Sequence, residues 1–535
     1  MRYHRFSQGL LLLLVIALLA ACNPAQPAAA PAALTIVSGS ENQPLQPMIE
    51  AWASSQGYSI QITYLGSLDI ARLLQSGTVT YDAVWPANRL WIDYGDTGNL
   101  VKYDESIMRS PVVFAVKRSI ADKLGWIGKD VFMADILAAT EAGKIRFMMT
   151  SATQSNSGAS FYFGALSAFA GRPDVLSPDD LQKADVKEKI TRILGTINRS
   201  SGSSGWLKDL FIQQYDRYDA MVNYESVMID ANVALVKAGQ EPLYAIYPVD
   251  GLTIADSPLA YIDHGDKQKE ERFLALQKHL LSAEVQGQLL QLGRRATLIG
   301  VQVPDASASV FKPEWGIDVN RVLQPIRFPN RDVIGEALNL YQIAFRKPSC
   351  TAYVLDFSGS MVDSGEADLK QAMRTLLDQT LANQYLLQGH PDDVTSVIVF
   401  NNTVINESEL DKWSVKGNDA DQLRQLYVKI DALSADGGTN IFDSTRLALQ
   451  QLAKKRTKAC LPAVILMTDG QDTVGNQGAL VQYIKSTEND IPVFAITFGA
   501  ADESQLTPIT SMTFGRIFNG TKDLIKAFRE AKGYN

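Results

Sequence analysis

Three polar segments of the chain hold oxygen atoms that could together bind a divalent metal ion. The first is Asp356-x-Ser358-x-Ser360, the second provides Thr439 behind two glycines, and the third provides Asp469 between a threonine and a glycine. Carboxylate and hydroxyl oxygens are hard ligands, which suit Mg²⁺, Mn²⁺ or Ca²⁺ and not Zn²⁺ or copper. One short loop cannot surround an ion, so the sequence predicts a site built from all three segments.

Two predicted strands and one predicted helix would bring these segments together. A β-branched and apolar run over residues 351–355 ends at the first segment, and a second apolar run over residues 462–467 ends at the third. Neither run has a helical period, which indicates buried strands. The glycine-opened loop over residues 436–440 leads into a helix that begins near Phe442. In an open doubly wound sheet, ligands bind beyond the carboxyl ends of the strands where the strand order reverses, so we expect both carboxylates in one crevice there.

These segments resemble the metal-ion-dependent adhesion site of von Willebrand factor A domains, over roughly residues 349–530. The resemblance implies a doubly wound, Rossmann-like α/β domain. It also implies that two serines and one threonine bind the ion directly, that two aspartates bind it directly or through water, and that an acidic residue of a partner protein completes the shell. The implied cofactor is Mg²⁺, or Mn²⁺ or Ca²⁺ in its place. The implied ligands are Asp356, Ser358, Ser360, Thr439 and Asp469.

The composition is that of an acidic globular protein. Of the 535 residues, 46% are apolar and 20% are charged, which is enough to bury the cores of two or three domains. The net charge of −8 argues against a nucleic-acid partner, because nucleic-acid binding needs a basic face. From residue 349 onward, 23 acidic residues stand against 17 basic ones, so most of the excess negative charge belongs to the predicted metal-binding domain.

The amino-terminal segment resembles the signal of bacterial lipoproteins. Arg2 and Arg5 precede an apolar core over residues 9–21, which is too short to span a bilayer. The core ends in Leu-Ala-Ala-Cys22, similar to the lipobox, in which the signal is cut before the cysteine and the cysteine carries the lipids. We therefore expect Cys22 to anchor the protein on a membrane, outside the cytoplasm. An ordinary secretory signal with a chance cysteine is the alternative.

After a Pro/Ala-rich tether, the chain alternates predicted strands and helices, which is typical of a parallel sheet with a crevice at the strand ends. A polar stretch from Thr150 to Ser160 is predicted as a loop that opens a helix over residues 161–170. The amino end of such a helix can bind an anion. The predicted strands are 34–37, 60–64, 83–85, 144–149 and 243–247.

This layout resembles the two-lobed periplasmic solute-binding proteins, including the molybdate-type ones, and stretches such as 64–67 and 247–251 contribute to the likeness. The resemblance implies one lobe from residues 34 to about 112 plus the return after 250, a second lobe from the middle, and a small-molecule or oxyanion solute between them, gated by hinge closure. Turn formation and helix capping are alternative roles for the polar residues at the strand ends. The candidate ligand-binding residues are Ser38, Ser40, Ser67, Ser157, Gly158 and Ser160.

The predicted domain order follows from these segments. A proline-rich connector with several aromatic residues separates the two folded regions, and its composition predicts packing rather than free chain. The predicted units are a signal at 1–22, a tether at 23–33, a two-lobed domain at 34–310, a connector at 311–348 and a von Willebrand factor A domain at 349–535.

The sequence favours a binding protein over an enzyme. The chain has only four histidines, and a serine nucleophile has no identifiable base. Asp356 could suggest an aspartyl-phosphate nucleophile, but Ser358 stands where a second acidic residue is expected. One hypothesis is a lipid-anchored adhesion or scaffold protein that uses its metal ion to grip an acidic residue of another protein. The alternative is the substrate-binding component of an ABC-type importer, with the second domain docking it to partners.

The two remaining cysteines, Cys350 and Cys460, precede the two strands of the metal site. If those strands are neighbours, the lateral spacing suits a disulfide. With Asp356 opposite Asp469, however, the cysteines are offset by three residues, or about 10 Å in straight chains, unless Leu461-Pro462 bends the chain back. An oxidising compartment and a single available pair favour the bond, and two buried free thiols are the alternative.

Overall fold

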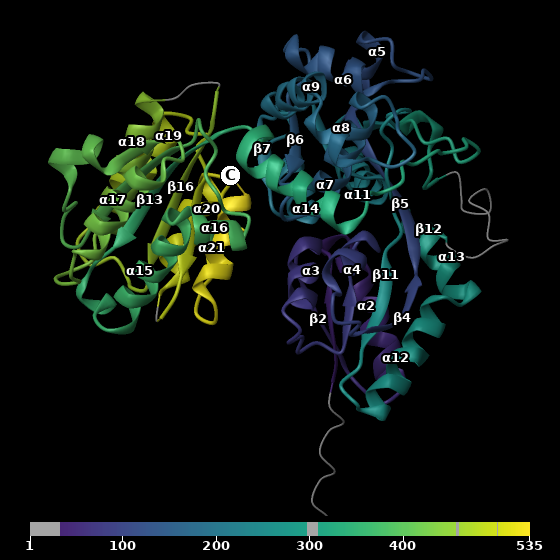
Figure 1. Cartoon of the computed structure of the whole chain (residues 1–535), viewed down its shortest axis with the longest axis horizontal. Coiled ribbons are helices and arrows are strands. Elements are labelled where there is room, and N and C mark those ends of the chain that lie inside the picture. The colour runs from purple at the N-terminus through teal and green to yellow at the C-terminus, as the bar shows by residue number, and fades with distance from the viewer. Residues whose placement is uncertain (1–32, 297–308, 456–458, 500, 535) are drawn as a thin grey trace, which may run out of the picture.

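The computed structural model describes residues 33–296, 309–455, 459–499 and 501–534. The predicted signal, its Cys22 and most of the tether lie outside the described residues. Figure 1 shows three α/β bodies, namely two lobes that stack on each other and a carboxyl-terminal domain beside them. No helix in these described ranges is apolar and long enough to cross a lipid bilayer.

The first lobe is built on a five-stranded sheet in the order β2-β1-β3-β11-β4. The first three strands are parallel and β11 is antiparallel, because the chain returns from the second lobe to add it. The strands are β1 Leu34–Ser38, β2 Ile60–Tyr64, β3 Ala83–Trp85, β4 Val101–Ser106 and β11 Pro258–Ile262. The helices are η1 Ser40–Leu45, α2 Gln46–Ser55, α3 Ser67–Gln75, α4 Leu90–Gly95, α12 Lys267–Leu280 and α13 Ala283–Gln291.

The second lobe has a sheet in the order β10-β5-β8-β6-β7, with β9 and β12 also paired to β5. Its strands are β5 Met108–Lys117, β6 Phe147–Thr150, β7 Arg199–Ser201, β8 Ala220–Tyr224, β9 Leu243–Ile246, β10 Ile254–Ala255 and β12 Arg295–Ala296. Its helices are α5 Arg118–Lys123, α6 Met133–Glu141, α7 Asn156–Phe169, α8 Pro178–Gln182, α9 Ala184–Gly195, α10 Ser204–Gln213 and α11 Glu225–Lys237. The chain enters this lobe at β5 and returns to the first lobe at β11, after β10.

One predicted boundary in the second lobe is wrong. The stretch up to Ser160 was expected to be a loop, but α7 begins at Asn156. The small residues of this first turn let the helix pack under the end of β6, where the Gly158 N–H donates to the Thr150 hydroxyl at 2.8 Å. A side chain at Gly158 would meet the Thr150 carbonyl oxygen at 2.0 Å, so close packing requires glycine there.

The connector is packed, as its aromatic residues predicted. Phe311 and Trp315, in and beside η3 (Pro313–Trp315), join the core of the second lobe. Further on, α14 (Arg331–Leu340) lies against the same lobe, where Tyr162 donates to the Ala337 carbonyl at 2.8 Å. The π-helical turn η4 (Tyr341–Phe345) then leads into the next domain.

The carboxyl-terminal domain is a six-stranded sheet in the order β15-β14-β13-β16-β17-β18, parallel except at β15. Its strands are β13 Ser349–Asp356, β14 Val394–Phe400, β15 Ser414–Lys416, β16 Leu461–Thr468, β17 Val493–Thr497 and β18 Ile517–Asn519. Its helices are η5 Gly359–Met361, α15 Ser364–Leu377, α16 Gln379–Gln384, η6 Glu407–Trp413, α17 Ala420–Asp431, α18 Ile441–Lys454, α19 Gln477–Ser486, α20 Glu503–Met512 and α21 Leu524–Gly533. Separate hydrophobic clusters cover the two faces, as expected for a doubly wound sheet.

The strand order reverses between β13 and β16, which are hydrogen-bonded neighbours. At the amino ends of these strands, Cys350 and Cys460 form a disulfide with Cα atoms 5.7 Å apart. The register explains why the bond closes. Cys350 lies opposite Pro462, so Cys460 is offset by two residues and not by three. The last register pair is Leu355 with Met467, so the next residue, Asp356, lies beside Thr468. Asp469 is one residue further along its strand, which accounts for the one-residue difference from the predicted offset.

Candidate metal centre and interlobe cleft

The carboxyl ends of β13 and β16 bring the predicted metal-binding residues to one edge of the sheet. Asp356 is the last residue of β13, and Asp469 directly follows β16. The two strands are parallel neighbours, so both carboxylates leave the sheet on the same side of the reversal point. The prediction of one crevice for both strand ends agrees with the observed strand order.

Asp356 is fully buried and held by two hydrogen bonds. Its Oδ1 accepts the Ser358 N–H at 2.8 Å, which closes the tight turn after β13. Its Oδ2 accepts the Thr468 hydroxyl at 2.6 Å, which links the ends of the two strands. The carboxylate therefore has one orientation, fixed from both neighbouring strands.

The hydroxyls of two serines link the part of the cluster around Asp356 to Asp469. Ser358 Oγ lies 3.1 Å from Ser360 Oγ, and Ser360 donates to Asp469 Oδ1 at 2.8 Å. Ser358 is fully buried, whereas Ser360 is exposed. The cluster therefore has a closed side within the sheet edge and an open side toward solvent.

Thr439 joins the cluster from the loop before α18. Its N–H donates to the Thr473 hydroxyl at 2.8 Å, so the loop after β16 holds this residue in place. A Cβ built on Gly470 would lie 2.9 Å from Ser360 Oγ and 3.6 Å from Thr439 Oγ1, so both hydroxyls border the same glycine. The structure thus brings all five predicted metal-site residues to one place.

The electrostatics of the cluster favour a cation. The pKa of Asp356 is raised to about 6, mainly by burial and also by the nearby Asp469 carboxylate, against hydrogen bonds from Ser358 and Thr468 that lower it. Burial also raises the pKa of Asp469. No lysine or arginine of the described ranges pairs with either carboxylate, and a bound cation would relieve both costs.

The donor set fits a hard divalent ion. It consists of two carboxylates and three hydroxyls, with an exposed side where water or a partner's oxygen could complete the coordination. Within the described residues there is no group of three or more His, Cys, Asp or Glu side chains that could hold a metal ion. An ion at this edge would therefore depend on hydroxyl ligands as much as on carboxylates.

Comparison with known families assigns both regions. Residues 34–295 match the family model of the bacterial extracellular solute-binding proteins, and residues 352–526 match that of the von Willebrand factor type A (VWA) domain. The chain joins a solute-binding-protein domain to a VWA domain. Both are α/β folds, as the sequence predicts, and the VWA domain is doubly wound and Rossmann-like.

Individual relatives are distant. The Escherichia coli (strain K12) protein named "Uncharacterized protein YfbK" is 25% identical over 181 residues, which are 34% of this chain and only 29% of that protein. The sulfate-binding protein SubI of Mycobacterium tuberculosis H37Rv aligns with 57% of this chain and 96% of its own, at 18% identity and a TM-score of 0.39. A VWA protein of Catenulispora acidiphila aligns with 36% of this chain and 44% of its own, at 18% identity and a TM-score of 0.30.

The solute-binding domain has a cavity of about 320 Å³ between its lobes. Of the six predicted ligand-binding residues, Ser40 and Ser67 line it. The other four are buried and bonded within the lobes. Ser38 bonds to Asn42, Ser157 to Thr150 and Ser204, Gly158 to Thr150, and Ser160 to Asn156.

The lobes touch directly beside this cavity. Ser203 of the second lobe donates to Ser40 Oγ of the first at 3.0 Å, and the Gly205 N–H reaches the same oxygen at 3.2 Å. On another side, Trp91 donates to Asn156 at 2.7 Å across the lobes. The lobes are therefore closed on each other.

Several residues of these sites had no signal in the sequence. Thr468 and Thr473 orient metal-site residues, and only their position next to strand ends could have indicated them. The cavity is also lined by Arg516, Glu530 and Tyr534, which belong to the VWA domain. No local pattern predicts that contribution, because it depends on how the two domains dock.

Proposed function

We propose that the protein is a lipid-anchored extracytoplasmic binding protein whose VWA domain holds a divalent ion and uses it to bind an acidic group of a partner protein. The observation that supports this function is the convergence of two carboxylates and three hydroxyls at the reversal point of the VWA sheet. The exposed side at Ser360 gives a partner's carboxylate access to the ion. The role is binding and not catalysis, since the titratable groups of the cluster are engaged with hydroxyls or backbone N–H groups.

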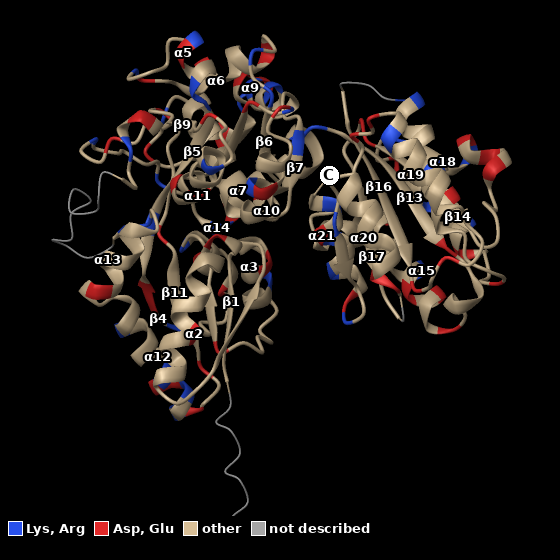
Figure 2. Cartoon of the chain, turned by 180° about the vertical axis from the view of Figure 1, so that it is seen from behind, with Lys and Arg blue, Asp and Glu red and all other residues tan. Residues whose placement is uncertain are grey.

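The domain composition supports a location outside the cytoplasm, because the first domain matches an extracellular solute-binding family. Anchoring through Cys22 is part of the proposal and rests on the sequence. The charge distribution supports a protein partner over a nucleic acid. Figure 2 shows Lys and Arg interspersed with Asp and Glu over the described residues, instead of being gathered on one face.

Calorimetry of the full chain with Mg²⁺ tests the metal site. Loss of an outer hydrogen-bonding partner typically weakens metal binding by about 10–100-fold, so Asp356→Ala should cost at least about 100-fold. Asp436→Ala is the matched control, because it removes an exposed carboxylate from the same loop as Thr439. That carboxylate accepts a hydrogen bond from Asn401 and takes no part in the cluster. Equal Mg²⁺ binding by the wild type and Asp356→Ala would contradict the proposal.

A second test concerns the partner. Complexes isolated with the native protein should dissociate in chelator and fail to form with Asp356→Ala, but should form with Asp436→Ala. If the complexes persist in chelator, the partner binds at a site other than the proposed metal site.

The interlobe cavity favours a second binding role, for a small solute. Its lining carries four carboxylates, of which Asp69 is paired with Arg529 and Asp209 with Lys208. The other two, Glu41 and Glu530, stand against the guanidinium of Arg516 within the lining. Serine and tyrosine hydroxyls complete much of the remaining polar lining. We propose that this lining selects a neutral hydroxyl-bearing or cationic solute over an oxyanion, because a second anion would add to the repulsion. Service to an importer is the alternative function, and dependence of solute uptake on this protein would support it.

A further inference from the structure

The carboxyl-terminal helix of the VWA domain lies where the two lobes of the solute-binding domain meet. In Figure 1, the C-terminus lies between the VWA sheet and β7 of the second lobe. Helix α21 and the residue after it contribute Glu530 and Tyr534 to the interlobe cavity, and Arg516 comes from just before β18. The cavity thus has three walls, and the third is not part of the solute-binding domain.

Helix α21 holds the first lobe through a buried ion pair. Arg529 Nη2 lies 2.7 Å from Asp69 Oδ1 of α3, and both side chains are nearly inaccessible to solvent. Arg72, one turn along α3, is a second cation near Asp69. Burial and, to a smaller extent, the neighbouring Arg529 charge lower the pKa of Arg72 to about 10. Two guanidinium groups therefore compete for one carboxylate.

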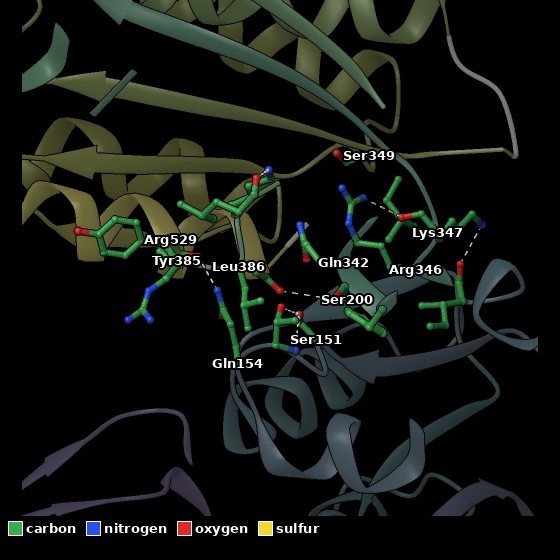
Figure 3. A pocket seen from close by; sticks show the side chains of 17 residues that line it. Ser151, Gln154, Ser200, Gln342, Arg346, Lys347, Ser349, Tyr385, Leu386 and Arg529 are labelled. Carbon is green, nitrogen blue, oxygen red and sulfur yellow. Dashed lines mark hydrogen bonds between the residues drawn. The ribbon is translucent and has the colours of Figure 1, made fainter. Parts of the chain in front are cut away.

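The same helix holds the second lobe through Gln154, Ser200 and Trp206. The Gln154 side chain donates to the Arg529 carbonyl, and Figure 3 shows it directed at that segment. Ser200 donates to the Gly533 carbonyl at 3.4 Å. The ring of Trp206 packs edge-on against Tyr534 with the centroids 4.9 Å apart.

Gln154 is the point at which all three bodies meet. Its side chain donates to α21, while its backbone carbonyl accepts the Leu68 N–H of the first lobe at 3.5 Å. A Cβ on Gly66 would lie 2.2 Å from that carbonyl oxygen, so the close approach of the lobes depends on glycine there. Separation of the lobes would therefore break contacts on one side of α21 or the other.

We propose that α21 is an intramolecular latch that keeps the two lobes closed and couples the VWA domain to the interlobe cavity. The lobes cannot open while α21 remains bound to both of them. By linkage, whatever shifts the VWA domain away from the lobes favours the open cleft, and a solute that contacts all three walls favours the docked VWA domain. This inference is independent of the metal ion and of the identity of the solute.

The test is amide hydrogen exchange of the full chain, with small-angle scattering of the same samples. Arg529→Gln removes the ion pair but leaves Arg72 to compensate Asp69, so the variant avoids an uncompensated buried charge. We expect exchange in α21 and in the lobe contacts at Leu68 and Gly205 to become faster by on the order of tenfold, with a larger radius of gyration. Gly205 is the diagnostic amide, since it bonds to Ser40 across the lobes and not to α21.

Arg217→Ala is the matched control. Arg217 lies 4.0 Å from Asp490 and so joins the VWA domain to the second lobe alone. This variant should leave the exchange at Gly205 and the radius of gyration unchanged. Asp69→Asn provides a second variant from the lobe side, and its effect combined with Arg529→Gln should be smaller than the sum of the two.

Three results would overturn the latch. If α21 exchanges faster in Arg529→Gln while the lobe contacts and the radius of gyration keep their wild-type values, α21 does not hold the lobes together. If neither α21 nor the lobe contacts change, the ion pair contributes nothing to docking. If Arg217→Ala opens the lobes as much as Arg529→Gln does, the opening follows from any loss of contact between the domains and is not specific to α21.

Discussion

At the scale of single residues, the proposed metal site depends on hydroxyls that neighbouring segments hold in place. Asp356 is fixed by Ser358 and Thr468, and Thr439 is fixed by Thr473. Since the proposed site has only two carboxylates, each hydroxyl would provide a large share of the coordination of an ion there.

Thr439→Val should therefore weaken Mg²⁺ binding by about 10–100-fold while the fold is retained, because valine has the same shape without the oxygen. Titration calorimetry with the full chain measures the change. Thr445→Val is the control, since Thr445 is a fully buried threonine on α18 whose hydroxyl has no hydrogen-bond partner. Unchanged affinity in Thr439→Val would remove this residue from the ligand set.

At the scale of elements, a buried ion pair fastens the VWA sheet to the preceding helical turn. Arg346, which follows η4, binds Asp393 through two nitrogens at 2.9 and 2.5 Å. Asp393, just before β14, also accepts the N–H groups of Ser349 and His390. Burial raises the pKa of Asp393, but Arg346 outweighs that effect and holds the pKa well below its usual range.

Asp393→Asn should lower the free energy of unfolding at pH 7 by about 3–5 kcal/mol, because Arg346 is left buried without its counter-charge. The folded pKa is depressed, so this stabilisation is fully present above the unfolded value of 3.8 and is lost as the pH falls toward the folded value. Denaturant titrations at pH 7 and pH 3 should show the difference between wild type and variant shrinking in acid. A difference that is independent of pH would contradict the assigned cause.

The disulfide acts at the same end of this sheet, since Cys350 lies beside Val394, the residue after Asp393. It links residues 110 positions apart, so breaking it should lower the free energy of unfolding by about 2–5 kcal/mol. The double variant Cys350→Ser/Cys460→Ser should show this loss in denaturant titrations. Its Mg²⁺ affinity should stay within about threefold of the wild type, because the bond lies at the amino ends of the strands and the metal site at their carboxyl ends. A large loss of affinity would show that the two ends are coupled.

At the scale of the whole molecule, the proposed anchor, the cleft and the metal site belong to one chain, with the VWA domain docked on both lobes. Acylation of Cys22 would hold this assembly at a membrane. We expect the wild type to sediment with membranes and Cys22→Ala to appear as soluble or unprocessed protein in cell fractionation. Recovery of the wild type as soluble protein with its amino terminus beyond residue 22 would contradict the anchor.

The sequence by itself determined the α/β class of both domains and the candidate residues of the proposed metal site. Apolar runs bounded by turn residues located β2 and β3 with their observed bounds, because strand formation there depends on local pattern. The metal-site residues follow strand ends or open a helix, so motif and topology together placed them. The sequence favoured the disulfide but left two free thiols open, because the register it implied was one residue off.

Only the tertiary structure decided which polar residues face the interlobe cavity and what covers it. Ser157 and Ser160 have the same local signal as Ser40, but they lie within the closely packed start of α7 while Ser40 lies at the lobe contact. The approach of Arg529 to Asp69 joins residues from different domains. Such contacts arise from the fit of two folded surfaces, which no local spacing of residues encodes.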